Sequence, residues 1–154
     1  MEELRAHLLR CAPPSSTHTS EMRRSMKALK LTPNLVVRDV SASLAFYRNV
    51  LGFERAFSVP DDPPYVFAAC GGNGIEIFFN DRKAVAEDYP ALAATIGGSF
   101  TMFIEVEDLK AVLDNVEKHG AKITMPVKEQ FYGMREFAFE DLDGYVITIA
   151  EKMK

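Results

Sequence analysis

The sequence has few of the residues that build disulfides, soft-metal sites or membrane spans. Its 154 residues include two cysteines, three histidines and no tryptophan. Cys11 and Cys70 lie in different segments without CxxC spacing, so we expect two reduced thiols rather than a disulfide. No apolar run approaches the roughly 18 residues that a membrane-spanning helix needs. These absences favour a cytoplasmic protein that does not associate with membranes.

Catalytic and nucleic-acid signatures are also missing. There is no G-x-S-x-G segment, no cysteine beside a histidine and no phosphate-binding loop. Five of the 18 Lys/Arg residues and three of the 22 Asp/Glu residues lie in residues 1–29, which leaves 13 basic and 19 acidic residues for the rest. An acidic body without a basic stripe argues against a nucleic-acid partner, because phosphate binding needs clustered Lys and Arg.

Residues 1–29 differ in composition from the remainder and are predicted to be a flexible N-terminal extension. The segment CAPPSSTHTS, residues 11–20, has the Pro/Ser/Thr content of a linker. Alternatives for this extension are an organellar targeting peptide and a translation start at Met22 or Met26. We expect the folded domain to cover residues 30–154.

A strand, a capped helix and a glycine turn are predicted over residues 31–53. Leu35 and Val37 alternate with Asn34, Val36 and Arg38, which gives the strand one strongly apolar face, and Asp39 is suited to cap the following helix. The helix has apolar residues at helical spacing, and Gly52 ends it. Further strands are predicted over 53–58, 65–70 and 75–80, with turns at 59–64 and 71–74.

The same pattern returns after a connector over residues 81–98, in which a short helix around 85–89 is interrupted by Pro90. A strand is predicted over 100–106, and Asp108 caps a helix that Gly120 ends. Strands follow over 121–126, 134–140 and 145–150, with a loop over 127–132. The chain is therefore predicted to be an α+β domain of two βαβββ modules, residues 31–80 and 99–151, whose mixed sheets form a cupped half-barrel.

Several motifs resemble the vicinal oxygen chelate superfamily, which includes glyoxalase I, bleomycin resistance proteins and extradiol dioxygenases. They are VRDVSASLAFYRNVLGF at 37–53, GIEIFFN at 74–80, VEDL at 106–109 and REFAFEDLDGY at 135–145. The resemblance implies paired βαβββ modules and a homodimer with two cups. In metal-dependent members it also implies a divalent ion held by His, Glu or Gln from the first and last strands of each module.

The positions that match those ligands are Thr32, Glu76, Thr101 and Thr148. Only Glu76 is a competent ligand, because a neutral threonine hydroxyl is a poor donor for Zn, Ni or Fe. His7 and His18 lie in the extension, and His119 is expected at a helix C-terminus, where its charge is favourable. We therefore predict no metal and no other cofactor.

Strand alternation separates two sets of side chains. One set is apolar and is expected to pack against the helices: Leu35, Val37, Ile75, Ile77, Phe79, Met102, Ile104, Tyr145, Ile147 and Ile149. The opposite set is mixed, as a ligand cup should be: Thr32, Asn34, Val36, Glu76, Phe78, Thr101, Phe103, Glu105, Val146 and Thr148.

Candidate binding residues in the mixed set are the three threonines, Asn34, Glu76, Phe78 and Phe103. Tyr132 could stack on a ligand from a loop at the mouth of the cup, and Arg135 could pair with Glu76 or an anionic ligand. The alternatives are that Phe78 and Phe103 only fill space between modules, that Glu76 and Arg135 are solvated, and that Glu105 faces solvent.

The leading hypothesis is a dimeric, metal-free binding protein that resembles bleomycin resistance proteins and holds a small aromatic or cationic molecule. The alternative is an enzyme of the glyoxalase-like lyase, isomerase or dioxygenase type, with Glu76 as base or residual metal ligand. A third hypothesis is a stand-alone module whose dimer interface is its function.

Overall fold

The computed structural model describes residues 30–98 and 100–153, and Thr32–Lys154 form one compact unit. The extension predicted over residues 1–29 lies outside the described residues, together with Cys11, His7 and His18. In the described part of the chain, no helix is both long and apolar enough to cross a membrane.

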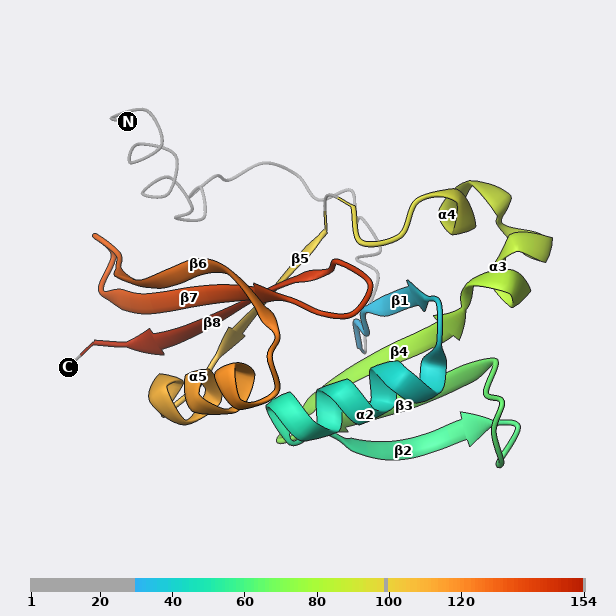
Figure 1. Cartoon of the computed structure of the whole chain (residues 1–154), viewed down its shortest axis with the longest axis horizontal. Helices are drawn as coiled ribbons and strands as arrows, with labels where there is room; N and C mark the ends of the chain where they lie inside the picture. The colour runs from blue at the N-terminus through green and yellow to red at the C-terminus, as the bar shows by residue number, and fades with distance from the viewer. Residues whose placement is uncertain (1–29, 99, 154) are drawn as a thin grey trace, which may run out of the picture. The chain divides into compact units, whose positions relative to one another are not determined.

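The first module has the predicted order of elements (Figure 1). Its elements are β1 (Asn34–Val37), α2 (Val40–Leu51), β2 (Glu54–Val59), β3 (Phe67–Gly72) and β4 (Ile75–Asp81). The sheet order is β1-β4-β3-β2. Strand β1 runs parallel to β4 and the other pairs are antiparallel, so the crossover helix α2 joins β1 to the far edge of the sheet.

The second module repeats this arrangement. Its elements are β5 (Thr101–Glu105), α5 (Leu109–Lys118), β6 (Lys122–Glu129), β7 (Met134–Glu140) and β8 (Val146–Lys152). The order β5-β8-β7-β6, with β5 parallel to β8, is the order of the first sheet. Neither four-stranded sheet closes on itself, which confirms the predicted α+β half-barrel architecture.

Both long helices begin where an aspartate offers an oxygen to an unpaired backbone N–H. The Asp39 carboxylate accepts from the Ala42 N–H at 3.0 Å, and the Asp108 carboxylate accepts from the Ala111 N–H at 3.0 Å. Gly52 ends α2 with φ +71°, a conformation that glycine adopts without a side-chain clash.

The connector differs from its prediction. Pro90 was expected to interrupt a single short helix, but α3 (Arg82–Asp88) is followed by a second helix, α4 (Pro90–Ala94). Proline is compatible with the first turn of a helix, where no N–H donor is needed. Pro90 therefore ends one helix and begins the next.

Strand β6 also continues beyond its predicted end. A loop was expected over 127–132, but β6 pairs with β7 as far as Glu129. The pairing is irregular between Met125 and Lys128, where Pro126 and Val127 have no partner in the register. Because β6 is the outermost strand of its sheet, a residue without an N–H removes no essential ladder bond. The loop is reduced to a tight turn around Gly133.

The hairpin between β3 and β4 turns through Asn73 and Gly74, both with positive φ, as two-residue hairpin turns require. Gly71 precedes this turn and faces a very close backbone approach. A Cβ atom added at Gly71 would lie 2.0 Å from the Ile75 carbonyl oxygen, whereas one added at Gly72 meets nothing within 4 Å.

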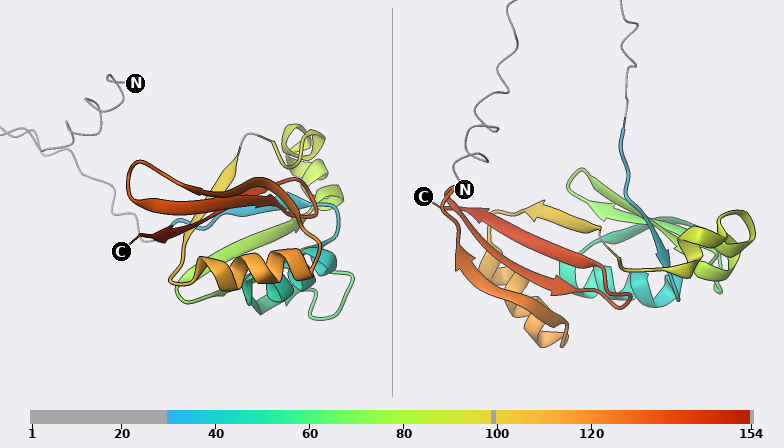
Figure 2. Two further views of the ribbon diagram at one scale, coloured as in Figure 1. Left: turned by 60° about the vertical axis from the view of Figure 1, so that its left-hand side comes forward. Right: turned by 90° about the horizontal axis from the view of Figure 1, so that it is seen from above.

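The core confirms the predicted apolar set, because nine of its ten members are at most 9% exposed. The exception is Ile75, at 38%. Helices α2 and α5 lie against each other, and the inner faces of both sheets join them in one apolar cluster (Figure 2). The opposite faces of the sheets are therefore the ones that remain for ligands or partners.

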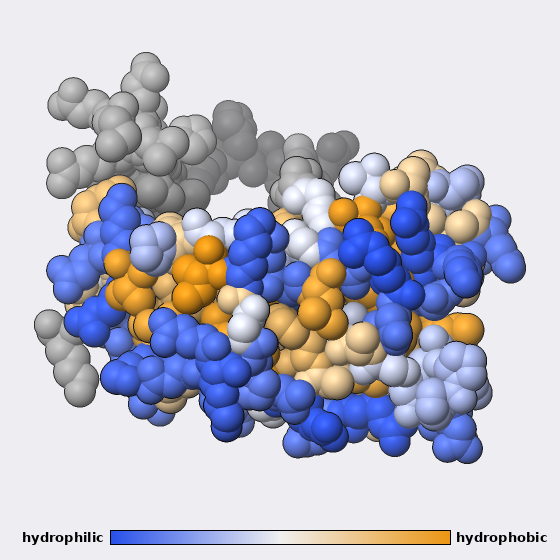
Figure 3. Space-filling view, viewed as in Figure 1, coloured by the Kyte–Doolittle hydropathy of each residue, from blue (hydrophilic) through white to orange (hydrophobic). Residues whose placement is uncertain are grey.

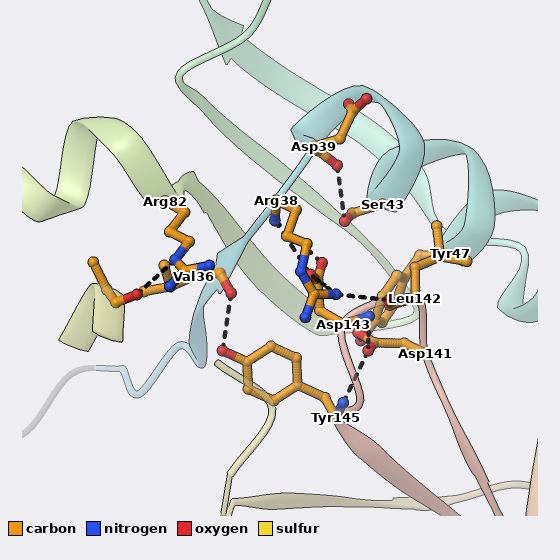
Figure 4. Close-up of polar contacts among 11 residues, drawn as sticks. Val36, Arg38, Asp39, Ser43, Tyr47, Arg82, Asp141, Leu142, Asp143 and Tyr145 are labelled. Atoms are coloured by element: carbon orange, nitrogen blue, oxygen red, sulfur yellow. Dashed lines mark hydrogen bonds and ion pairs between the residues drawn. The ribbon is translucent and has the colours of Figure 1, made fainter. Parts of the chain in front are cut away.

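A buried polar junction joins the two modules (Figure 4). The Tyr47 hydroxyl of α2 donates to the Asp141 carboxylate at 2.9 Å, and the other Asp141 oxygen accepts from the backbone N–H groups of Asp143 and Tyr145. Arg38 pairs with Asp143 at 3.1 Å. Burial raises the pKa of both aspartates, although these hydrogen bonds and the Arg38 charge oppose it. The junction fixes the turn between β7 and β8 against the first module.

Candidate functional site

We call the sides of the two sheets that face away from the helices the outer faces. Residues that are directly paired across neighbouring strands share one face. In the first sheet Asn34 is paired with Phe78, and in the second Phe103 is paired with Thr148, which is also paired with Ala138. The structure thus places Asn34 and Phe78 on the outer face of the first sheet, and Phe103 and Thr148 on that of the second.

In the first module, the Thr32 hydroxyl donates to the Glu76 carboxylate at 3.3 Å. Asn34 accepts a hydrogen bond from the Asn80 amide, and Phe78 makes an edge contact with Phe67 at 5.1 Å between ring centroids. Glu76 is neither fully buried nor fully exposed. This patch combines one carboxylate, neutral hydrogen-bonding groups and flat apolar rings.

In the second module, Phe103 is 56% exposed, so its ring does not fill space inside the chain. Glu105 is exposed, as expected for a residue that faces solvent. The Thr101 hydroxyl donates to the Val146 carbonyl at 3.0 Å, which commits its proton to the backbone. Thr148 lies between Phe103 and Ala138 in the strand register and is partly buried.

The structure adds Glu136, which the sequence reasoning missed. Its side chain is 4% exposed. Glu136 is paired with Ala150 on β8 and lies two residues before Ala138, which is paired with Thr148, so it belongs to the same outer face. The Tyr132 hydroxyl donates to Glu136 at 2.6 Å, and the hydrogen bond raises the pKa of Tyr132. Strand alternation against the core residues Phe137 and Phe139 could have identified this position.

Arg135 lies apart from the candidates. It has the same strand parity as Phe137 and Phe139, which are completely buried on the helix side of the sheet. Its guanidinium is 3.8 Å from the Glu129 carboxylate and 3.9 Å from that of Glu151. These contacts replace the predicted pairing with Glu76 and place Arg135 at the end of the inner face.

The donor set does not fit a catalytic metal. Three of the four matching positions are threonines, and a neutral hydroxyl is a poor ligand for Zn, Ni or Fe. Residues 30–98 and 100–153 contain no group of three or more His, Cys, Asp or Glu that could hold an ion. His119 caps α5, with its Nδ1 2.8 Å from the Asn115 carbonyl oxygen.

Paired βαβββ modules with mixed, unclosed sheets define a half-barrel class of small-molecule-binding and catalytic proteins. The sequence model of the Glyoxalase/Bleomycin resistance protein/Dioxygenase superfamily matches residues 28–149. The chain therefore belongs to this superfamily.

Solved structures with this fold carry different names. A glyoxalase/bleomycin resistance protein/dioxygenase from Nocardioides is 19% identical and has a TM-score of 0.65. The match covers 99% of this chain and 93% of the Nocardioides chain. TioX from Micromonospora sp. ML1 is 17% identical, with a TM-score of 0.66 and coverages of 82% and 100%. The fosfomycin resistance protein FosX from Listeria monocytogenes is 14% identical, with a TM-score of 0.63 and coverages of 83% and 96%.

A search of curated proteins finds no match. At these identities the structural neighbours show the fold alone, and the function has to be argued from the outer faces.

Proposed function

We propose that this protein binds a small aromatic, cationic molecule on the outer faces of its sheets. The observation that carries this proposal is that each of these faces combines aromatic rings with a carboxylate. Phe78 and Glu76 belong to the first module, and Phe103, Tyr132 and Glu136 belong to the second. Aromatic faces and carboxylates both attract organic cations.

The proposal includes a homodimer. Two aromatic side chains of the second module are open to solvent in one chain, because Phe103 is 56% and Tyr132 52% exposed. Figure 3 shows one side of the molecule, on which apolar patches interrupt a mostly hydrophilic surface. A second copy that covers these faces would enclose the ligand and strengthen its electrostatic contacts, because excluding water lowers the local dielectric.

The test is a thermal-shift screen of basic, neutral and anionic aromatic compounds, followed by calorimetric titration of the hits. We expect the basic compounds to raise Tm and bind in a salt-sensitive manner. Glu76→Gln should weaken them about fivefold, because a half-exposed ion pair contributes about 1 kcal/mol. Glu87→Gln, an exposed residue of α3, is the matched control and should leave the affinity unchanged.

If no aromatic compound of any charge binds, the proposal fails. If Glu76→Gln and Glu87→Gln bind equally to wild type, Glu76 has no part in recognition. Sedimentation analysis on the same sample tests the dimer, and a monomer at all concentrations would exclude it.

An enzymatic use of the same face remains an alternative. Glu76 sits beside Thr32 on the outer face, where it could accept a proton from a bound substrate. If Glu76→Gln retains binding of a compound but loses its conversion, Glu76 is a base rather than only an anchor.

A further inference from the structure

The turn between β6 and β7 places a buried carboxylate behind an exposed phenol. Glu136 is 4% exposed, whereas Tyr132 is 52% exposed and its hydroxyl is 2.6 Å from one Glu136 oxygen. The Gln130 amide donates to the other Glu136 oxygen at 3.2 Å. Both donors are neutral. In the described part of the chain, no Lys or Arg forms an ion pair with this carboxylate.

The phenol in this pair is held in place by a short turn. The Gln130 N–H donates to the Met134 carbonyl at 2.7 Å, and the Gly133 N–H donates to the Gln130 carbonyl at 3.0 Å. Gly133 has φ +83°, which closes the turn tightly. Tyr132 is therefore presented from a defined backbone geometry rather than from a long loop.

The electrostatics of the pair favour a hydrogen-bond donor that carries positive charge. The phenol donates its proton to the Glu136 carboxylate, and this hydrogen bond raises the pKa of Tyr132. The free lone pair of the phenol oxygen then faces away from Glu136. It lies within the field of a negative charge that the surrounding protein keeps from water.

An aromatic wall adjoins the phenol. Phe131 is 84% exposed and meets the Tyr132 ring edge-on at 5.1 Å between centroids. A large aromatic side chain this exposed has free apolar surface that a ligand ring can cover. Lys128 is the cross-strand partner of Glu136 but is exposed and forms no ion pair with it, so it competes only weakly.

We infer that the Tyr132 hydroxyl is the subsite for a protonated primary or secondary amine attached to an aromatic group, with Glu136 as the charge behind it. The ammonium N–H donates to the phenol oxygen, and the ligand ring packs on Phe131. Glu136 acts through Tyr132 and is a positioning residue. This inference rests on the proposed function and names its charge-recognising part.

The test uses 2-phenylethylamine and three matched probes: 2-phenylethanol, 3-phenylpropionate and trimethyl(2-phenylethyl)ammonium. Affinities are measured on the full chain by NMR titration. We expect the amine to bind tightest, because the alcohol lacks the charge, the carboxylate is repelled and the quaternary ion has no N–H to donate. Glu136→Gln should weaken the amine about tenfold and leave the alcohol unchanged, because the substitution removes a charge that attracts only the cation.

Tyr132→Phe removes only the hydroxyl and should weaken the amine about fivefold with no effect on the alcohol. Tyr89→Phe, at a residue between α3 and α4 that is 63% exposed, is the matched control and should change neither affinity. Lys128→Gln removes the nearby cation and should strengthen amine binding about twofold. Circular dichroism of each variant checks that the fold is retained.

The inference is overturned if Glu136→Gln and Tyr132→Phe bind the amine as wild type does, or if they weaken the amine and the alcohol equally. Binding of the amine in those variants would still support the proposed function. If none of the four probes binds and the wider aromatic screen also fails, the proposed function fails instead.

Discussion

Replacing Tyr47 with phenylalanine isolates the hydrogen bond that joins α2 to the turn of the second module. The Tyr47 side chain is completely buried, and its ring packs against Phe79 at 4.9 Å and Phe53 at 6.3 Å between centroids. Phenylalanine keeps these ring contacts and removes only the oxygen. The change therefore leaves the Asp141 carboxylate without its one side-chain donor.

The expected loss of unfolding free energy is about 2 kcal/mol. A hydrogen bond to a charged group contributes about 1.5–3 kcal/mol, and Asp141 keeps two backbone donors, which favours the lower half of that range. For a unit of this size the loss corresponds to a fall in Tm of about 6–10 °C. Urea unfolding followed by circular dichroism measures the free energy, with an unchanged m value if both states keep their compactness.

A double-mutant cycle with Asp141→Asn assigns the effect to the pair. We expect a coupling energy of at least about 1 kcal/mol between the two substitutions. Tyr89→Phe serves as the control and should stay within about 0.5 kcal/mol of wild type. Additive effects in the cycle, or a Tyr47→Phe variant as stable as the control, would refute the assignment of this bond to the module junction.

Two further predictions concern stability. Burial raises the folded-state pKa of Asp141 above its ordinary value of 3.8. The contribution of Asp141 to the unfolding free energy is therefore fully present below that pH and is lost as the pH rises through the raised pKa. The unfolding free energy of wild type minus that of Asp141→Asn should fall from pH 3 to pH 7, and a rise would contradict the buried-carboxylate assignment. Gly71→Ala should lower the unfolding free energy, measured in urea, by about 3 kcal/mol, because the added Cβ would meet backbone atoms. Gly72→Ala has open space around it and should lower it by less than about 1 kcal/mol. Equal losses would show that the hairpin yields to the extra methyl group.

Much of the fold followed from local signals in the sequence. The helices begin at Asp39 and Asp108 because a carboxylate at that position satisfies an N–H group that the helix leaves unpaired. The inner residues of the strands followed from period-two alternation, and only Ile75, at the start of a strand beside a hairpin turn, departs from burial. These signals act over a few residues, so they can be recognised without the tertiary structure.

The candidate site was only partly predictable for the opposite reason. Alternation assigned Phe103 and Glu76 to an outer face, but it did not show that Glu136 would be buried beneath Tyr132 or that Arg135 would pair with Glu129. Those contacts depend on how the turn at Gly133 folds back on β7.

By itself the sequence determined the repeated module and its caps. It also placed Thr32, Thr101 and Thr148 at positions where the family resemblance implies metal ligands, from which we predict that no metal binds. These properties belong to residue types and short-range spacing. Only the tertiary structure decided that β6 continues past Pro126, because an edge strand tolerates a missing N–H. It also brought Tyr47 to Asp141 across 94 residues, a contact that arises from the packing of one module on the other.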